Sequence, residues 1–500
     1  MKALKGLLIY IGIVIGGLAG LALILFCAMY FFPSFRIAGL GVIHKTETIE
    51  EDVITLSNYS GYNDIAVSVK SGNVGINVYP TDKTDIVYDA KLKVFGLSTE
   101  IVEYTVLKQV DVKDNVLNIY LTITEPSGWL SVSESCINIG VPSTTSIGIN
   151  INTEKGDISI GSDDLLINLD DIVVNTGTGD FEIVNVGTGE TEKSLTVNSL
   201  NLTTEKGEFD FSSIDNLTVN SKVKLKAEDS EFKFKNLYAS LDVIGTNVRI
   251  IADTISCGAS GLSCVTESGK IKVKNLTTSS GAENTFISDN FSYDITELKG
   301  KTAIVTTSGN INIGTSNDYL YIENEHGNVY VKNAKSTIIA TTYMGNITIE
   351  NYYATGNFTS DKGDITVNNH SEYNSGFYTE IKNVDGKVVV YNKVNRLLLT
   401  TTGRSNVEVT FGEIKEGEIF QHKINTSTQG SCVVYMPTVN VPPYKFVAKG
   451  IISGEIGVSI SASENDQFYP SLTYKNQAVL NASFEFIGRI TFKSYSNISN

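Results

Sequence analysis

The sequence predicts an all-β protein: a single-stranded parallel β-solenoid (β-helix) ectodomain preceded by one N-terminal transmembrane helix. Three observations lead to this prediction. A short phrase with Gly at a fixed place returns along the chain, the composition is that of short strands and tight turns, and one long uncharged apolar run lies near the amino terminus. Each is taken in turn below.

The repeated phrase reads TTSGNINI from Thr306, NEHGNVYV from Asn324, TYMGNITI from Thr342 and SDKGDITV from Ser360, so its Gly returns every 18 residues. After the Gly, polar and aliphatic residues alternate, which places the aliphatic side chains on one face of a short strand. A strand of this length is not stable alone. Copies stacked about 4.8 Å apart would bury the aliphatic residues in one continuous column, as in a parallel β-solenoid.

The Gly of each phrase is interpreted as structural, marking a corner or a close approach between rungs that a side chain would obstruct. Related phrases recur at intervals of about 18 to 28 residues, which indicates loops of different length between constant strands. The repeat glycines are Gly72, Gly156, Gly179, Gly207, Gly269, Gly309, Gly327, Gly345, Gly363 and Gly386. A sandwich or barrel is less consistent with the phrase, because strands of those folds are not copies of one another.

Composition supports the same class. The chain of 500 residues has 43 Gly but only 8 Pro, and it is rich in Ser, Thr, Asn, Val and Ile. The formal net charge of -16 argues against a nucleic-acid partner, which would require a basic face. We therefore expect no nucleic acid among its partners.

The apolar run covers residues 7–32 and carries no charge over its 26 residues. That length as a helix is enough to cross a bilayer, and it exceeds the apolar core of a cleaved signal peptide. We expect a single-pass anchor in the cell membrane, in contact with lipid through residues 7–32, with the C-terminal domain extracellular. Gly12, Gly16 and Gly20 have the spacing that lets two such helices approach, so self-association is a further hypothesis.

Three stretches resemble, in order, the opening of the bacterial family named "putative adhesin". They read IAVSVKSGNVGINVYPTDKTDIVYDAKLKV from Ile65, VDVKDNVLNIYLTI from Val110 and CINIGVPSTTSIGININTEKGDISI from Cys136. In that family a strand pair around SGxVxI precedes a VP turn, and rungs of TxxGDIxI follow. The resemblance implies a surface-exposed β-solenoid, often tethered by one membrane helix, and it offers no catalytic residue to transfer. Ser230 in the Gly position and the displaced Gly403 depart from the pattern.

The expected organisation has five parts: a short cytoplasmic tail and transmembrane anchor (1–33), a juxtamembrane linker (34–64), the first strands of the adhesin-like domain (65–150), the solenoid repeats (151–460) and a C-terminal cap (461–500). The cap is expected because the last stretch loses the Gly phrase and gains Phe484, Phe486 and Phe492. Solenoids need such caps at their open edges.

The sequence offers little chemistry. The acidic pairs Asp163–Asp164 and Asp170–Asp171 could in principle serve glycoside cleavage, but adjacent strand residues point to opposite faces. The four His are widely separated and are interpreted as loop or surface residues, so we expect no metal and no cofactor. Cys257 and Cys264 either close a small disulfide loop or remain two buried thiols.

These observations favour a non-catalytic, membrane-anchored, adhesin-like protein that binds an extracellular ligand, a glycan or a protein, or acts as a scaffold at the bacterial cell surface. Two alternatives remain at this point. One is a carbohydrate-active β-helix enzyme, a polysaccharide lyase or glycosidase, because solenoids also house those activities. The other is an envelope-stress or signalling partner that acts through the membrane helix.

Overall fold

The protein is an all-β chain with 73% of its residues in strands, arranged as a β-solenoid. The computed structural model describes residues 2–31, 36–37, 41–98, 105–124, 129–133, 135–162, 167–184, 193–372, 374, 376–392, 396–412, 420–426, 430–437, 444–455, 459–462, 467–468 and 482–495. The chain divides into two compact units, Met1–Asn220 and Ser221–Asn500.

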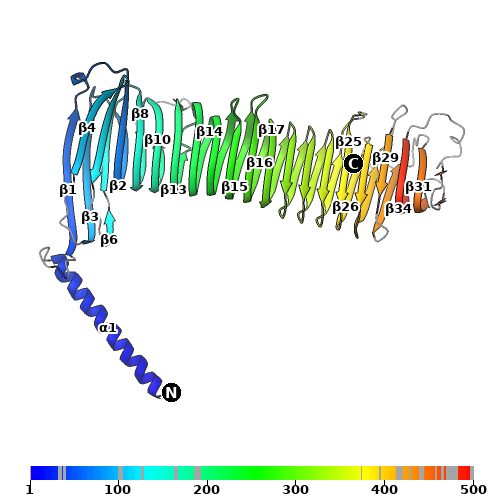
Figure 1. Ribbon diagram of the computed structural model, residues 1–500, viewed down its shortest axis with the longest axis horizontal. Helices are drawn as coiled ribbons and strands as arrows, with labels where there is room; N and C mark the ends of the chain where they lie inside the picture. Colours follow the sequence, from blue (N-terminus) through cyan, green and yellow to red (C-terminus); the bar gives the residue numbers. More distant parts are fainter. Residues whose placement is uncertain are drawn as a thin grey trace. The chain divides into compact units, whose positions relative to one another are not determined.

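The first unit begins with a helix, followed by strands and one 3-10 turn (Figure 1). Its elements are α1 (Lys2–Phe31), β1 (Gly41–Ile54), η1 (Leu56–Asn58), β2 (Asp64–Thr81), β3 (Ile86–Ser98), β4 (Thr105–Lys113), β5 (Val116–Thr124), β6 (Trp129–Ser133), β7 (Ser135–Pro142), β8 (Ile147–Lys155), β9 (Ile158–Gly161), β10 (Leu169–Thr178), β11 (Phe181–Val184), β12 (Ser194–Val197) and β13 (Ser199–Phe211). Residues 34–64, interpreted above as a linker, thus contain β1 and η1.

Strand direction changes within this unit. Pairing is antiparallel between β1 and β3, between β3 and both β6 and β7, and between β4 and β5. Strand β2 pairs in parallel with β5 and β8 along its first half and with β7 and β9 along its second half. From β8 onward, β10 and β13 continue one parallel ladder, and β11 and β13 continue another. Parallel rungs therefore start on β2.

The second unit consists of strands among its described residues. Strand β14 (Asn216–Cys257) leads into it, and β15 (Leu262–Thr278), β16 (Glu283–Lys299), β17 (Lys301–Ser308), β18 (Ile311–Ser316), β19 (Leu320–Asn324), β20 (Val329–Ala334), β21 (Ile338–Thr342), β22 (Ile347–Tyr352), β23 (Gly356–Ser360), β24 (Ile365–Asn369), β25 (Tyr378–Asn383), β26 (Lys387–Asn392), β27 (Arg396–Thr401), β28 (Asn406–Phe411), β29 (Phe420–Asn425), β30 (Ser431–Pro437), β31 (Tyr444–Glu455), β32 (Ser459–Ala462), β33 (Gln467–Phe468) and β34 (Ala482–Tyr495) follow.

Two parallel ladders run through the second unit (Figure 1). One joins β17, β19, β21, β23, β25, β27 and β29, and the other joins β16, β18, β20, β22, β24, β26, β28 and β30. Ile311 pairs with Val329, Val329 with Ile347, and Ile347 with Ile365, which is the 18-residue step of the repeated phrase. Each copy of the phrase is therefore one rung, and the predicted parallel β-solenoid is confirmed for these strands.

The aliphatic residues of the phrase form the core. Ile311 and Ile313 are 1% and 0% exposed, while Asn312 between them is exposed. At the corner, a Cβ on Gly327 would lie only 1.7 Å from the carbonyl oxygen of Gly309. The backbones of corner glycines in neighbouring rungs therefore lie too close together to leave room for a side chain.

The carboxyl-terminal strand is not the outermost one. Strand β34 pairs in parallel with β29 and β30 and also with β31, so it lies between them (Figure 1). Strands β32 and β33 then pair antiparallel with β31. Much of 461–500 lies outside the described residues, and its role as a cap stays a prediction.

The apolar run 7–32 was predicted to cross a membrane, and nearly all of it is helical in α1. In the described part of the chain, no helix is both sufficiently long and sufficiently apolar to cross a membrane. The structure therefore does not support the predicted transmembrane anchor. Self-association through Gly12, Gly16 and Gly20 stays a prediction.

Candidate functional site

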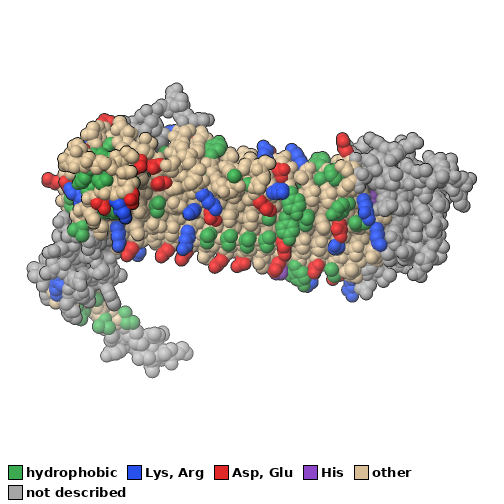
Figure 2. Space-filling view, turned by 45° about the horizontal axis from the view of Figure 1, so that its top comes forward, with side chains coloured by type: hydrophobic (Ala, Val, Ile, Leu, Met, Phe, Trp, Pro, Cys, Tyr) green, Lys and Arg blue, Asp and Glu red, His purple; other side chains and the backbone are tan. Residues whose placement is uncertain are grey.

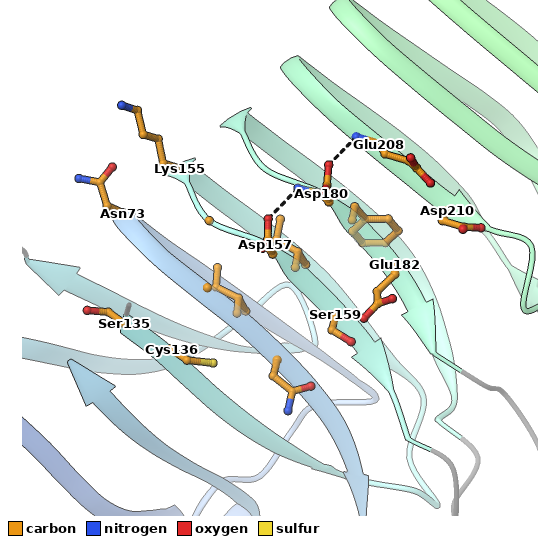
Figure 3. Close-up of a pocket in the computed structure, with 16 residues that line it drawn as sticks. Asn73, Ser135, Cys136, Lys155, Asp157, Ser159, Asp180, Glu182, Glu208 and Asp210 are labelled. Carbon is orange, nitrogen blue, oxygen red and sulfur yellow. Dashed lines mark hydrogen bonds between the residues drawn. The ribbon is translucent and has the colours of Figure 1, made fainter. Parts of the chain in front are cut away.

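The first unit has a half-open groove of about 810 Å³ where the parallel rungs begin (Figure 3). Strands β2, β7, β8, β9, β11 and β13 and the corners between them supply its lining. The lining residues are Asn73, Gly75, Ile76, Asn77, Ser135, Cys136, Lys155, Gly156, Asp157, Ile158, Ser159, Asp180, Phe181, Glu182, Glu208 and Asp210.

The second half of β2 positions one end of the groove. Gly75 pairs with Cys136 of β7, and the next residue, Ile76, pairs with Ile158 of β9. Gly75 adds no side chain to the lining. A Cβ there would be in van der Waals contact with the carbonyl oxygens of Asp157, at 3.4 Å, and Ser135, at 3.5 Å.

Strand alternation creates the first row of polar side chains. Asn77 pairs with Ser159, Ser159 with Glu182, and Glu182 with Asp210. Their neighbours along the strands are core residues, of which Phe181 is 1% exposed. Because successive residues point to opposite faces, burying the aliphatic and aromatic residues turns amide, hydroxyl and carboxylate groups outward in register.

The corners supply a second row, whose carboxylates also hold the backbone. Asp157 Oδ1 accepts a hydrogen bond from the Asp180 backbone N–H at 3.0 Å. Asp180 Oδ1 in turn accepts one from the Glu208 backbone N–H at 2.8 Å (Figure 3). Each side chain thus satisfies a corner amide of the next rung, which would otherwise lack a partner at the break between strands.

The same arrangement recurs in the second unit. Asn310 Oδ1 accepts from Asn328 N–H at 3.2 Å, Asn328 Oδ1 from Asn346 N–H at 3.0 Å, and Asn346 Oδ1 from Asp364 N–H at 2.8 Å. In the copies of the phrase at Gly309, Gly327 and Gly345, the Asn after the Gly therefore has a structural role. From the sequence, this residue was interpreted only as polar. The signal was present, because Asn or Asp follows Gly in all four copies of the 18-residue repeat.

We predict that Asp180→Ala lowers the free energy of unfolding by about 1 kcal/mol, because the Glu208 N–H loses its acceptor. Asp180→Asn keeps an oxygen at the same place and is expected to leave stability nearly unchanged. Urea unfolding of both variants measures the difference. Equal losses in the two variants would show that the carboxylate charge, and not the acceptor, is what matters.

The groove is strongly acidic. It contains five carboxylates (Asp157, Asp180, Glu182, Glu208 and Asp210) against one Lys155, a formal charge of -5 + 1 = -4. Burial, and then the nearby Asp89, raise the pKa of the Cys136 thiol, so Cys136 is a poor nucleophile. Among the described residues, no group of His, Cys, Asp and Glu has an arrangement that could hold a metal ion.

Most of the repeat glycines lie outside this groove; of them, only Gly156 lines it. Gly72 is next to it, and its carbonyl accepts a 2.9 Å hydrogen bond from Thr153 Oγ1. Apart from Gly72, the repeat glycines stack along the corners, where a Cβ would meet a carbonyl oxygen of the preceding rung within 2.4 Å; they are Gly156, Gly179, Gly207, Gly269, Gly309, Gly327, Gly345, Gly363 and Gly386.

Cys257 and Cys264 are both free and buried. Cys264 pairs with Val243, and Cys257 pairs with Thr278. Burial raises the pKa of each thiol to about 12. They are two separate core thiols.

Of the two acidic pairs considered for catalysis, the structure describes Asp170–Asp171. Asp163 and Asp164 lie outside the described residues. Asp171 accepts a 2.5 Å hydrogen bond from Ser199 Oγ, and Asp170 accepts one from Asn198 Nδ2. Burial, followed by repulsion from Asp171 and Asp64, raises the pKa of Asp170, but its carboxylate bonds the next rung and does not line the groove.

The interpretation of the four His as loop or surface residues is wrong for His422, which is 3% exposed inside β29. His370 stacks between Tyr353 and Tyr391, with ring centroids 6.2 and 6.1 Å apart. The ring planes are tilted by 37° and 36°. Tyr352, beside Tyr353, is fully buried.

No protein-family model matches the chain, and no curated protein matches it. The resemblance of the repeat phrases to the adhesin family is therefore not confirmed by a family model. Two solved structures are similar, and they are described as a "putative cell adhesion protein" from Clostridium sporogenes ATCC 15579 and a "putative adhesin" from Bacteroides fragilis NCTC 9343.

The first is 12% identical, with 91% of this chain and 100% of that chain covered and a TM-score of 0.17. The second is 16% identical, with 65% of this chain and 97% of that chain covered and a TM-score of 0.13. TM-scores this low carry no argument about function. The structure of this chain shows a β-solenoid with an acidic, polar groove at its first parallel rungs.

Proposed function

We propose that the chain is a non-catalytic, adhesin-like binding protein of the bacterial cell surface, and that the groove around Gly75 binds a glycan. The observation that carries the proposal is the row Asn77, Ser159, Glu182 and Asp210, held in register on four neighbouring strands. Amide, hydroxyl and carboxylate groups at fixed spacing are the groups that hydrogen-bond sugar hydroxyls.

The chemistry of the lining favours a polar ligand. Sites for apolar small molecules are lined mostly by hydrophobic and aromatic side chains. Here the aromatic residue in the lining, Phe181, is 1% exposed, so its ring belongs to the core. A polyhydroxylated ligand satisfies such a lining better than an apolar one.

The rigid attachment of the corner carboxylates favours binding over catalysis. Glycoside hydrolysis needs one carboxyl as acid and another as nucleophile or base. Asp157 and Asp180 accept backbone N–H groups of the next rung instead. Immobile polar groups on strands are suited to recognition because little conformational entropy is lost on binding.

We predict that the double variant Glu182→Ala, Asp210→Ala weakens glycan binding by the intact chain about tenfold or more, since each lost charge-assisted hydrogen bond contributes roughly 1 kcal/mol or more. The measurement is a glycan-array screen of the full-length protein, followed by titration of the best ligand. The matched control is Glu283→Ala, an exposed carboxylate at the start of β16 in the other unit.

Product analysis of every glycan well separates binding from catalysis. The proposal expects intact glycans after incubation. Shortened or unsaturated sugars would overturn it in favour of an enzyme. Full glycan binding by the Glu182→Ala, Asp210→Ala variant, as by the Glu283→Ala control, would place the binding site elsewhere on the chain.

A further inference from the structure

We propose that one face of the second unit is a docking surface for a cationic amphipathic helix of a partner protein. This surface is separate from the groove, and its test does not depend on glycan binding. Its centre is an apolar stripe, defined here as Ile244, Val265, Ile287 and Val305. Consecutive members pair with one another across strands β14, β15, β16 and β17.

The stripe is exposed to an unusual degree for large apolar side chains. Ile244 is 54% exposed, Val265 43% and Ile287 48%. Figure 2 shows hydrophobic side chains aligned in a row on one face, with acidic side chains along its margin. A contiguous apolar row with a polar margin is typical of an interaction site, whereas single exposed apolar residues are not.

The fold does not require apolar residues at these positions. On the following rungs the same place is taken by Glu323, Thr341, Thr359 and Lys382. Those rungs keep the same parallel pairing. Thr is also a good strand former, so strand propensity alone does not account for four consecutive aliphatic residues.

An acidic rim lies beside the stripe. Glu267 and Asp289 follow Val265 and Ile287 by two residues on the same strands, so they point outward on the same face. Both are exposed. Glu325, in the corner after β19, continues this acidic row, and Glu323 takes the stripe's own position on β19; both are exposed. We call Glu267, Asp289 and Glu325 the acidic rim.

The apolar stripe and the acidic rim together indicate which kind of partner would bind this surface. A helix lying across the rungs presents apolar residues once per turn, about every 5.4 Å, close to the rung spacing of about 4.8 Å. Lys or Arg along one side of that helix would lie against the acidic rim. A second copy of this chain is disfavoured, because it would bring the same rim and a formal net charge of -16.

The probe is a synthetic helical peptide of Leu and Lys, with Leu on one face, titrated against the full-length protein by fluorescence anisotropy. The variant Val265→Thr, Ile287→Thr gives these positions the residue found at Thr341 and Thr359, so its rungs should fold. We expect it to bind the peptide at least about tenfold more weakly, with an unchanged unfolding midpoint. The matched control is Ile339→Thr, an apolar residue on the same sheet but outside the stripe.

Charge is tested separately. The double variant Glu267→Gln, Asp289→Asn should bind the peptide more weakly, and its binding should depend less on salt concentration. The reason is that the variant loses the attraction between carboxylates and Lys, which is the part of the binding energy that salt screens. A peptide of Leu and Glu with the same pattern should not bind. Peptide binding unaffected by the Thr variant, or no binding by the wild type, would overturn the proposal. Sedimentation showing self-association that the Thr variant abolishes would overturn it in favour of a second copy.

Discussion

Gly345→Ala is expected to destabilise the second unit by about 3 kcal/mol or more, at the upper end of what overpacking costs. The added Cβ would lie 1.9 Å from the Gly327 carbonyl oxygen and 2.7 Å from its carbonyl carbon. No side-chain rotation relieves a contact with backbone. The two rungs must move apart, which weakens the hydrogen bonds between β19 and β21 and between β20 and β22.

The measurement is urea unfolding together with hydrogen exchange of the amides in β19 to β23. Gly258→Ala is the matched control, because its Cβ would meet only Ser240 Oγ, at an ordinary 3.6 Å. Protection should fall around Gly345 and stay unchanged in the control. A Gly345→Ala protein as stable as wild type would contradict the stacking of corner glycines.

Acid is expected to destabilise the carboxyl-terminal rungs through His422. This side chain is 3% exposed, its Nδ1 accepts the Leu397 backbone N–H at 3.2 Å, and its ring lies 4.7 Å from that of Phe411. Burial, and then the charge of Arg396, lower the pKa of His422 to about 3. The folded state therefore holds a neutral imidazole that the unfolded chain would protonate near its ordinary value of 6.5.

The sign follows from proton uptake. Below pH 6.5 the unfolded chain binds the proton and the folded chain does not. The stability contributed by His422 is therefore complete above that pH and falls toward pH 3, by up to about 1.4 kcal/mol per pH unit. His422→Gln retains an acceptor but does not titrate. The difference in unfolding free energy between wild type and this variant, measured from pH 7 to pH 4, should shrink or reverse on acidification, whereas parallel curves would contradict the buried neutral His.

Much of the second unit could be predicted from its sequence, because the fixed spacing of the repeat gives the register between neighbouring strands. Ile311, Val329, Ile347 and Ile365 occupy the same place in their phrases, and they pair in that order. The antiparallel direction of strands in the first unit could not be predicted from the sequence. Alternation of apolar and polar residues is the same whichever way a strand runs, so it indicates a face and not a direction.

The groove could not be predicted because its residues are distant in sequence. Asn77 and Ser159 become neighbours across 82 residues, and no short motif records that pairing. His422 is different, since its burial was readable. It lies two residues before Ile424, which is buried, so strand alternation places both on the core side. The residue type, and not the pattern, led to the surface interpretation.

The register of the rungs is the central claim, because both the groove and the apolar stripe depend on it. Thr341 pairs with Thr359, and Thr359 with Lys382, on outward positions of successive rungs. The direct test is the intact mass of oxidised double-cysteine variants. Thr341→Cys, Thr359→Cys should lose two hydrogen atoms and form a bridge, because neighbouring rungs lie about 4.8 Å apart, within disulfide reach.

Thr341→Cys, Lys382→Cys is the control, with its residues two rungs apart at roughly twice that spacing, beyond disulfide reach. Efficient crosslinking of the first pair and none of the second is the predicted result. Crosslinking of the second pair, or failure of the first under conditions where both thiols are accessible, would contradict the in-register parallel solenoid.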